Sequence, residues 1–90
     1  MNMAGVKVKL FANFREVTGV KEIELQSSTV GEVLDLLVKK YPKLKDLFYE
    51  GGKLRDYVNI MVNGRNIRGN TRYRLSEGDI VAIFPPVSGG

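Results

Sequence analysis

Hydrophobic and polar residues alternate in four stretches of the chain, and each alternation predicts a β-strand with one buried face. The stretches are residues 6–10, 21–26, 58–62 and 80–84. Residues 14–19 can form one helical turn that Gly19 ends, so the chain should open with a strand, a short link and a second strand. Asn63-Gly64 is a strong signal for a β-hairpin after the third stretch, with Ile67 on the returning strand.

A helix should occupy the middle of the chain. Thr29 and Glu32 have the capping-box spacing, in which the hydroxyl accepts an N–H of the first turn and the carboxylate reaches back. Pro42 prevents the helix from continuing past Tyr41. Apolar residues recur at three- and four-residue steps and form a stripe suited to core packing: Val30, Val33, Leu34, Leu37, Val38 and Tyr41.

Two less regular regions flank the third strand. The apolar residues between 44 and 48 predict a second, short helix that Gly51-Gly52 ends. After the hairpin, residues 68–74 are polar and irregular, and Tyr73 and Leu75 should anchor them to the core. Residues 76–79 read as a turn into the last strand.

Strands at both ends of the chain with one amphipathic helix between them imply an α+β fold. Its sheet should be mixed and packed on one face by one main helix. The β-grasp, or ubiquitin-like, fold has this order of elements. We expect the domain to span residues 1–84 and residues 85–90 to form an extended C-terminal tail.

The tail is the stretch best suited to chemistry. Pro85-Pro86 supply no backbone N–H, so a strand cannot keep pairing beyond them. The four residues that follow, from Val87 and Ser88 to Gly89 and Gly90, can reach about 13 Å at about 3.3 Å per extended residue. The two glycines lack Cβ and fit a narrow channel, which favours insertion of the terminal carboxylate into a partner's active site. The alternative is a frayed terminus.

Phe11 and Phe84 should lie on the sheet face that the helix leaves uncovered, because both share the parity of the outward residues of their strands. If the first and last strands are neighbours, the two rings form a small apolar patch beside the tail. Such a patch suits the docking of a partner, together with residues 85–88. The alternative for Phe11 is packing under the loop that follows it.

Cysteine and histidine are both absent, which removes thiolate chemistry and the usual zinc ligands. The acidic residues show no spacing typical of a metal site or a catalytic carboxylate pair. Gly51-Gly52-Lys53 does not match the spacing of a phosphate-binding loop and is interpreted as a turn. We therefore expect no metal, no bound cofactor and no catalysis by this chain alone.

The chain carries a formal net charge of +4, and four arginines cluster around the hairpin: Arg65, Arg68, Arg72 and Arg74. They could bind phosphate or acidic groups, as in a β-grasp RNA-binding module, but Tyr73 is the one aromatic residue among them, so a solvated face is favoured. No stretch approaches the ~18 apolar residues of a membrane span, and no apolar run precedes the first strand. We expect a cytoplasmic protein without nucleic-acid or membrane partners.

The run Phe84-Pro85-Pro86-Val87-Ser88-Gly89-Gly90 resembles the C-terminus of the small subunit of molybdopterin synthase, a MoaD-type member of the ThiS/MoaD family of ubiquitin-like sulfur carriers. Weaker similarity extends across nearly the whole chain. It lies in Val6 to Ala12, Arg15-Glu16, Gly19, the helix from Thr29, Val62-Asn63-Gly64 and Gly78-Asp79.

The resemblance implies that an E1-like, ATP-using enzyme of the MoeB type adenylates the Gly90 carboxylate, which then becomes a thiocarboxylate. A large MoaE-type subunit would receive the tail and transfer its sulfur to cyclic pyranopterin monophosphate, building the dithiolene of molybdopterin. A chain without cysteine cannot carry sulfur as a persulfide, which agrees with this role. Some archaeal relatives of the pattern are ubiquitin-like modifiers joined to protein lysines, and this alternative stays open because both uses share an activated Gly90.

Overall fold

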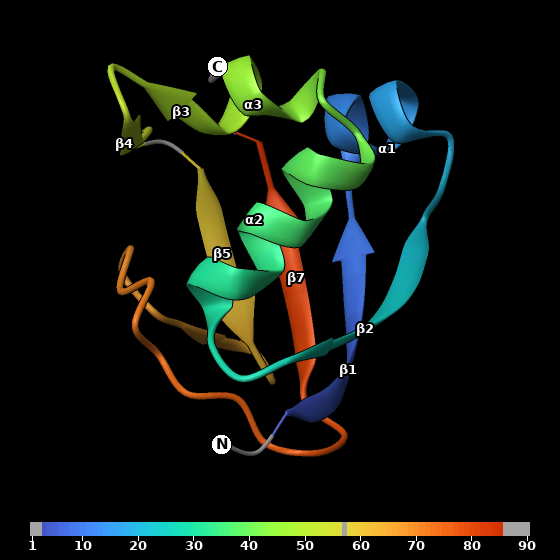
Figure 1. The fold of residues 1–90 in the computed structure, drawn as a ribbon, viewed down its shortest axis with the longest axis vertical. Coiled ribbons are helices and arrows are strands. Elements are labelled where there is room, and N and C mark those ends of the chain that lie inside the picture. The colour runs from blue at the N-terminus through green and yellow to red at the C-terminus, as the bar shows by residue number, and fades with distance from the viewer. Residues whose placement is uncertain (1–2, 57, 86–90) are drawn as a thin grey trace.

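The computed structural model describes residues 3–56 and 58–85 (Figure 1). Its elements, in chain order, are β1 (Ala4–Leu10), α1 (Ala12–Thr18), β2 (Glu22–Ser27), α2 (Val30–Lys40), α3 (Leu44–Phe48), β3 (Tyr49–Glu50), β4 (Lys53–Leu54), β5 (Asn59–Val62), β6 (Arg65–Asn66) and β7 (Ile80–Phe84). The four predicted strands and the main helix are all present.

The main sheet has five strands in the order β2-β1-β7-β5-β6. β1 and β7 pair in parallel, and the other neighbours in this sheet are antiparallel, so the sheet is mixed. Helix α2 crosses one face of the sheet, as Figure 1 shows. The predicted α+β arrangement with one main packing helix is therefore confirmed.

Residues with positive φ end helix α1 and form the turn between β5 and β6. The Gly19 N–H donates to the Arg15 carbonyl at 2.7 Å with a φ of 77°, so Gly19 ends α1 as expected. Asn63 and Gly64 have φ values of 52° and 81°, which suit a tight hairpin turn between β5 and β6. The returning strand is shorter than predicted, because β6 ends one residue before Ile67.

The N-terminus of α2 carries the expected cap in a modified form. The Thr29 hydroxyl accepts from the Glu32 N–H at 3.2 Å. The Glu32 carboxylate reaches one residue further back than a simple capping box and accepts from the hydroxyl of Ser28 at 2.6 Å and from its N–H at 2.7 Å. These two bonds hold the pKa of Glu32 below its ordinary value.

The prediction that Gly51-Gly52 ends the second helix is wrong. α3 ends at Phe48, and Tyr49 is already extended, with φ −123° and ψ 151°. Tyr49 instead pairs with Leu54 in a small two-stranded sheet of β3 and β4. The two glycines, with φ values of 60° and 81°, form the turn of that hairpin, which confirms their interpretation as a turn.

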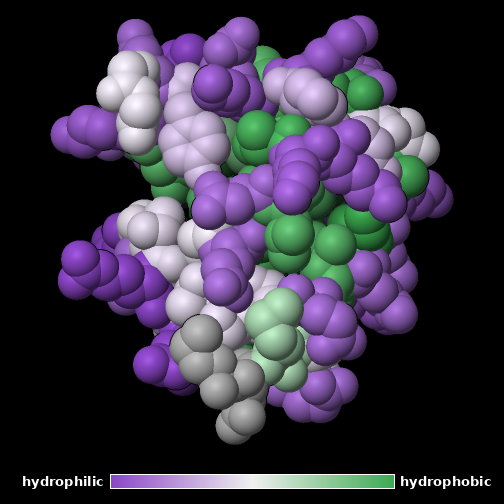
Figure 2. All heavy atoms as spheres, viewed as in Figure 1, coloured by the Kyte–Doolittle hydropathy of each residue, from purple (hydrophilic) through white to green (hydrophobic). Residues whose placement is uncertain are grey.

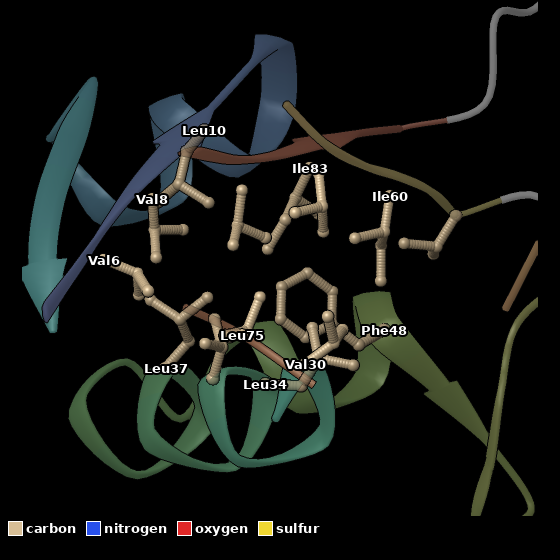
Figure 3. Packing of buried hydrophobic residues seen from close by; sticks show 14 of the residues in the cluster. Val6, Val8, Leu10, Val30, Leu34, Leu37, Phe48, Ile60, Leu75 and Ile83 are labelled. Atoms are coloured by element: carbon tan, nitrogen blue, oxygen red, sulfur yellow. The ribbon is translucent and has the colours of Figure 1, made fainter. Parts of the chain in front are cut away.

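The core lies between the sheet and the helices. Figure 3 shows side chains from both layers meeting there: Val8, Leu10, Ile60 and Ile83 from the sheet, with Val30, Leu34, Leu37 and Phe48 from the helices. Phe14 of α1 and Phe48 of α3 meet edge to face with ring centroids 5.1 Å apart. The outer side of α2 carries charged residues together with the exposed Leu36, and Figure 2 shows hydrophilic side chains there with hydrophobic ones between them.

Adjacent leucines of α2 provide a matched test of this packing. Leu37 is fully buried, whereas Leu36 is 37% exposed. We expect Leu37→Ala to lower the free energy of unfolding by about 2–5 kcal/mol, because it leaves a cavity in the core. Leu36→Ala, the same chemical change, should alter it by no more than about 0.5 kcal/mol. Chemical denaturation measures both, and equal losses would contradict the helix orientation.

Candidate functional site

The parallel pairing of β1 with β7 brings two aromatic rings together on the sheet face away from α2. Leu10 is the register partner of Ile83, so Phe11 comes beside Phe84 directly after it. The two rings stack with centroids 4.4 Å apart and planes inclined by 16°. The expected juxtaposition of the two rings is confirmed, and their contact with a partner stays a prediction.

The patch continues along β7 as an apolar stripe. Ile80 and Ala82 share the outward parity of Phe84, while Val81 and Ile83 between them are fully buried. Met61 of β5 is the register partner of Ala82 and extends the stripe sideways. We call this surface the outer stripe, comprising Phe11, Met61, Ile80, Ala82 and Phe84.

The sequence prediction covered only the two rings of the outer stripe. Ile80 and Ala82 have the same parity as Phe84 within one predicted strand, so the alternation already contained the signal for them. Met61 could not be added from the sequence, because its place beside Ala82 depends on the pairing of β5 with β7.

Polar residues flank the outer stripe on both sides. Toward β2, Lys7 and Lys9 are the register partners of Ile80 and Ala82, and Lys7 forms an exposed ion pair with Glu22 at 3.6 Å. Toward β6, Asn66 is the register partner of Met61. An apolar strip with a polar rim is the general anatomy of a protein-binding surface.

The outer stripe ends where the tail begins. β7 stops at Phe84, as the two prolines predict, and Pro85 follows it half-buried. Residues 86–90 lie outside the described part of the chain. The predicted partner contacts of Pro86, Val87 and Ser88, and the predicted chemistry at Gly89 and Gly90, therefore stay predictions.

Within residues 3–56 and 58–85, no group of three or more acidic side chains is arranged to hold a metal ion, and no helix is long and apolar enough to cross a membrane. Two groups in this part have a shifted pKa, and neither belongs to the outer stripe. One is the lowered pKa of Glu32 in the helix cap. In the other, burial and then the nearby Asp35 raise the pKa of the Tyr49 phenol.

Comparison with known proteins identifies the family. Residues 8–90 match the profile of the ThiS family. The chain belongs to the ThiS family. The resemblance to ThiS/MoaD carriers is thereby confirmed, as is the ubiquitin-like β-grasp fold.

Relatives of this ThiS-family chain carry two kinds of name. It is 38% identical to "Small archaeal modifier protein 3" of Haloferax volcanii, covering 94% of this chain and 98% of that one. It is 35% identical to the "Molybdopterin synthase sulfur carrier subunit" of Arabidopsis thaliana, covering 94% and 82% respectively. The solution structure of small archaeal modifier protein 1 from Methanosarcina acetivorans superposes with a TM-score of 0.89 at 43% identity, covering all of both chains. The family thus contains both sulfur carriers and ubiquitin-like modifiers.

Neighbouring residues of β7 test which face of this ThiS-family domain is free for docking. We expect Phe84→Lys to leave a cooperatively folded domain, with a loss of about 0.5–1.5 kcal/mol from the ring stack and a further small loss from reduced burial. Ile83→Lys places the same side chain in the core and should abolish folding, because an unpaired charge cannot be buried there. Circular dichroism with thermal melting compares the two. Unfolding of the Phe84 variant would show that the outward face has been misassigned.

Proposed function

We propose that this chain is a carrier whose Gly90 carboxylate is adenylated by an E1-like enzyme and then converted to a thiocarboxylate. The observation that supports it best is the stacking of Phe11 on Phe84 at 4.4 Å, at the point where β7 ends. An apolar docking surface at the base of residues 85–90 would hold the activating enzyme beside the carboxylate that it modifies.

The chemistry divides between the chain and its partner. A carboxylate is a poor electrophile, so the enzyme joins it to the α-phosphate of ATP, releasing pyrophosphate and leaving a mixed anhydride with AMP. The terminal sulfur of a donor persulfide then attacks the carbonyl carbon and AMP departs, which leaves an acyl disulfide. A thiol of the partner attacks the donor's inner sulfur and forms a disulfide with it, so the outer sulfur stays on Gly90 as the thiocarboxylate. The chain has no cysteine of its own to supply this sulfur. Its contribution is to position the carboxylate.

One use of the thiocarboxylate is in molybdopterin synthesis. In this proposal the chain is the small subunit of the synthase, and a large MoaE-type subunit receives the tail and moves its sulfur to cyclic pyranopterin monophosphate. The 35% identity to a molybdopterin synthase sulfur carrier subunit supports this branch.

The second use is protein modification. Here the ε-amine of a lysine on another protein attacks the activated carbonyl of Gly90, forming an isopeptide bond and releasing the activating group. Identities of 38% and 43% to proteins named small archaeal modifiers support this branch. This support is as strong as the support for the synthase branch. Both branches begin with the same adenylate, so one chain can serve both.

Activation is tested by intact mass. Incubation with an E1-like partner from the same genome, ATP and a sulfur donor should raise the mass of the chain by the difference between sulfur and oxygen. A variant lacking Gly89 and Gly90 should stay unchanged, and Phe84→Lys should react more slowly while remaining folded. Equal reaction of the shortened variant would show that Gly90 is not the activated residue.

Affinity capture from the native cell extract separates the two branches. The full chain should retain a pterin-binding subunit if it acts in the synthase, or appear as a ladder of lysine conjugates if it acts as a modifier. A control chain ending at Ser88 should form no conjugates. If both chains yielded identical partners and products, the proposed role of the tail would be wrong.

A further inference from the structure

A second surface feature is a segment of the chain that carries positive charge only. Residues 57–76 contain four arginines and no aspartate or glutamate. We call residues 65–74 the arginine loop, since they hold all four: Arg65, Arg68, Arg72 and Arg74. The loop begins with β6 at the edge of the sheet and passes below the N-terminus of α2 (Figure 1).

All four guanidinium groups are available to a partner. Each arginine is exposed, and Figure 2 shows strongly hydrophilic side chains projecting from this side of the molecule. The ion pairs in the described part of the chain are Lys7–Glu22 and Arg55–Glu50, so neither involves the arginine loop. No aspartate or glutamate lies between Asp56 and Glu77, so the sequence around the four arginines carries positive charge alone.

The backbone of the arginine loop is held at both ends and in its middle. Ile67 and Leu75 are buried in the core. The N–H of Ile67 donates to the backbone carbonyl of Ile60 at 3.2 Å, and the N–H of Leu75 donates to the backbone carbonyl of Ser28 at 2.9 Å. The carbonyl of Thr71 accepts from the N–H of Gly31 at 2.8 Å. The arginines therefore project from an ordered backbone, which lowers the entropy cost of binding through them.

The arginine loop adjoins the outer stripe. Its Asn66 is the register partner of Met61, and β6 lies two strands from β7, or about 10 Å at the usual strand spacing. Arg68 and Asn59 line one surface hollow of about 390 Å³, and Asn59 is the register partner of Phe84. A protein interface of ordinary size can cover the stripe and the near end of the loop together.

We infer that the arginine loop is a docking surface for a carboxylate-rich patch on the partner protein that covers the outer stripe. This inference rests on the proposed function, because it concerns how the activating enzyme finds the chain. Opposite charges steer diffusional encounter and fix orientation, while the apolar stripe supplies the burial that holds the complex together. The guanidinium groups can pair bidentately with carboxylates.

A protein partner fits this surface better than a nucleic acid. Single-stranded RNA is held by aromatic rings on which bases stack, and Tyr73, the aromatic residue of the arginine loop, is half-buried against the core. The adjacent outer stripe is apolar, and such a surface gains free energy from burial against another protein.

The test compares two variants with the same change of net charge. Arg65→Glu/Arg68→Asp reverses two charges of the loop, with aspartate chosen because Arg68 has a φ of 55°, where aspartate is tolerated. Lys39→Glu/Lys40→Glu reverses two exposed charges at the far end of α2. Thermal melting first establishes that both variants are folded.

Amide NMR titration with short poly-L-glutamate, and separately with mixed-sequence single-stranded RNA, reads out the surface. We expect poly-L-glutamate to shift amides of residues 65–74, and this response to disappear in the arginine variant but persist in the lysine variant. Shifts spread evenly over all basic residues, or tighter binding of RNA that is lost in the arginine variant, would overturn the inference.

Adenylation kinetics give the second readout. With the E1-like enzyme, kcat/KM should fall about tenfold in the arginine variant at low salt, converge with wild type at high salt, and stay near wild type in the lysine variant. Equal kcat/KM for wild type and both variants would overturn the inference while leaving the proposed function intact. If the enzyme did not adenylate even the wild-type chain, the proposed function would fail, and the NMR titration would still decide the charge of the ligand.

Discussion

The parallel pairing of the first strand with the last is the constraint on which the rest of the structure depends. It places β1 and β7 side by side in the sheet, with Leu10 opposite Ile83. The inner side chains of both strands form part of the core, and the outer ones end in the stacked rings of Phe11 and Phe84. A slip of one residue would turn Phe84 inward and Ile83 outward, so the register that fills the core also builds the outer stripe.

Local signals in the sequence were sufficient for most elements. Alternation gave the strands, the Thr29 cap gave the start of α2, and Asn63-Gly64 gave a hairpin turn, since each of these structures is encoded within a few residues. The prediction that Gly51-Gly52 end the second helix was wrong because glycines with positive φ occur both at the ends of helices and in hairpin turns. Only the pairing of Tyr49 with Leu54 distinguishes the two uses.

The candidate site was less predictable, because it depends on contacts between distant parts of the chain. Parity could assign Phe84 and Ala82 to one face, but period-two alternation does not say which strands are neighbours. The contribution of Met61 follows from the antiparallel pairing of β5 with β7. The chemistry at Gly90 was inferred from residue types and resemblance alone, and it lies beyond the described residues.

One face of β7 packs in the core, and the other forms part of the proposed docking surface. Val81 and Ile83 are fully buried, whereas Ile80 is 38% exposed. Substitutions on the outer face can therefore change the partner without removing core contacts. Relatives with 35–43% identity to this chain carry the names of both a synthase subunit and protein modifiers, and one of them superposes at a TM-score of 0.89, so the core is compatible with both kinds of name.

The positive charge of the arginine loop comes from its side chains and not from free N–H groups at the N-terminus of α2. The first N–H groups of α2 are already used, since Val30 donates to Tyr73 at 3.1 Å and Gly31 donates to Thr71 at 2.8 Å. The loop thus caps the helix, and the helix in turn fixes the loop.

A carrier that is charged by one enzyme and discharged by another must form complexes that also dissociate. In the proposed role, long-range attraction from the exposed arginines would speed encounter and the narrow apolar stripe would limit the lifetime of each complex. This division between the two surfaces would suit transfer between partners.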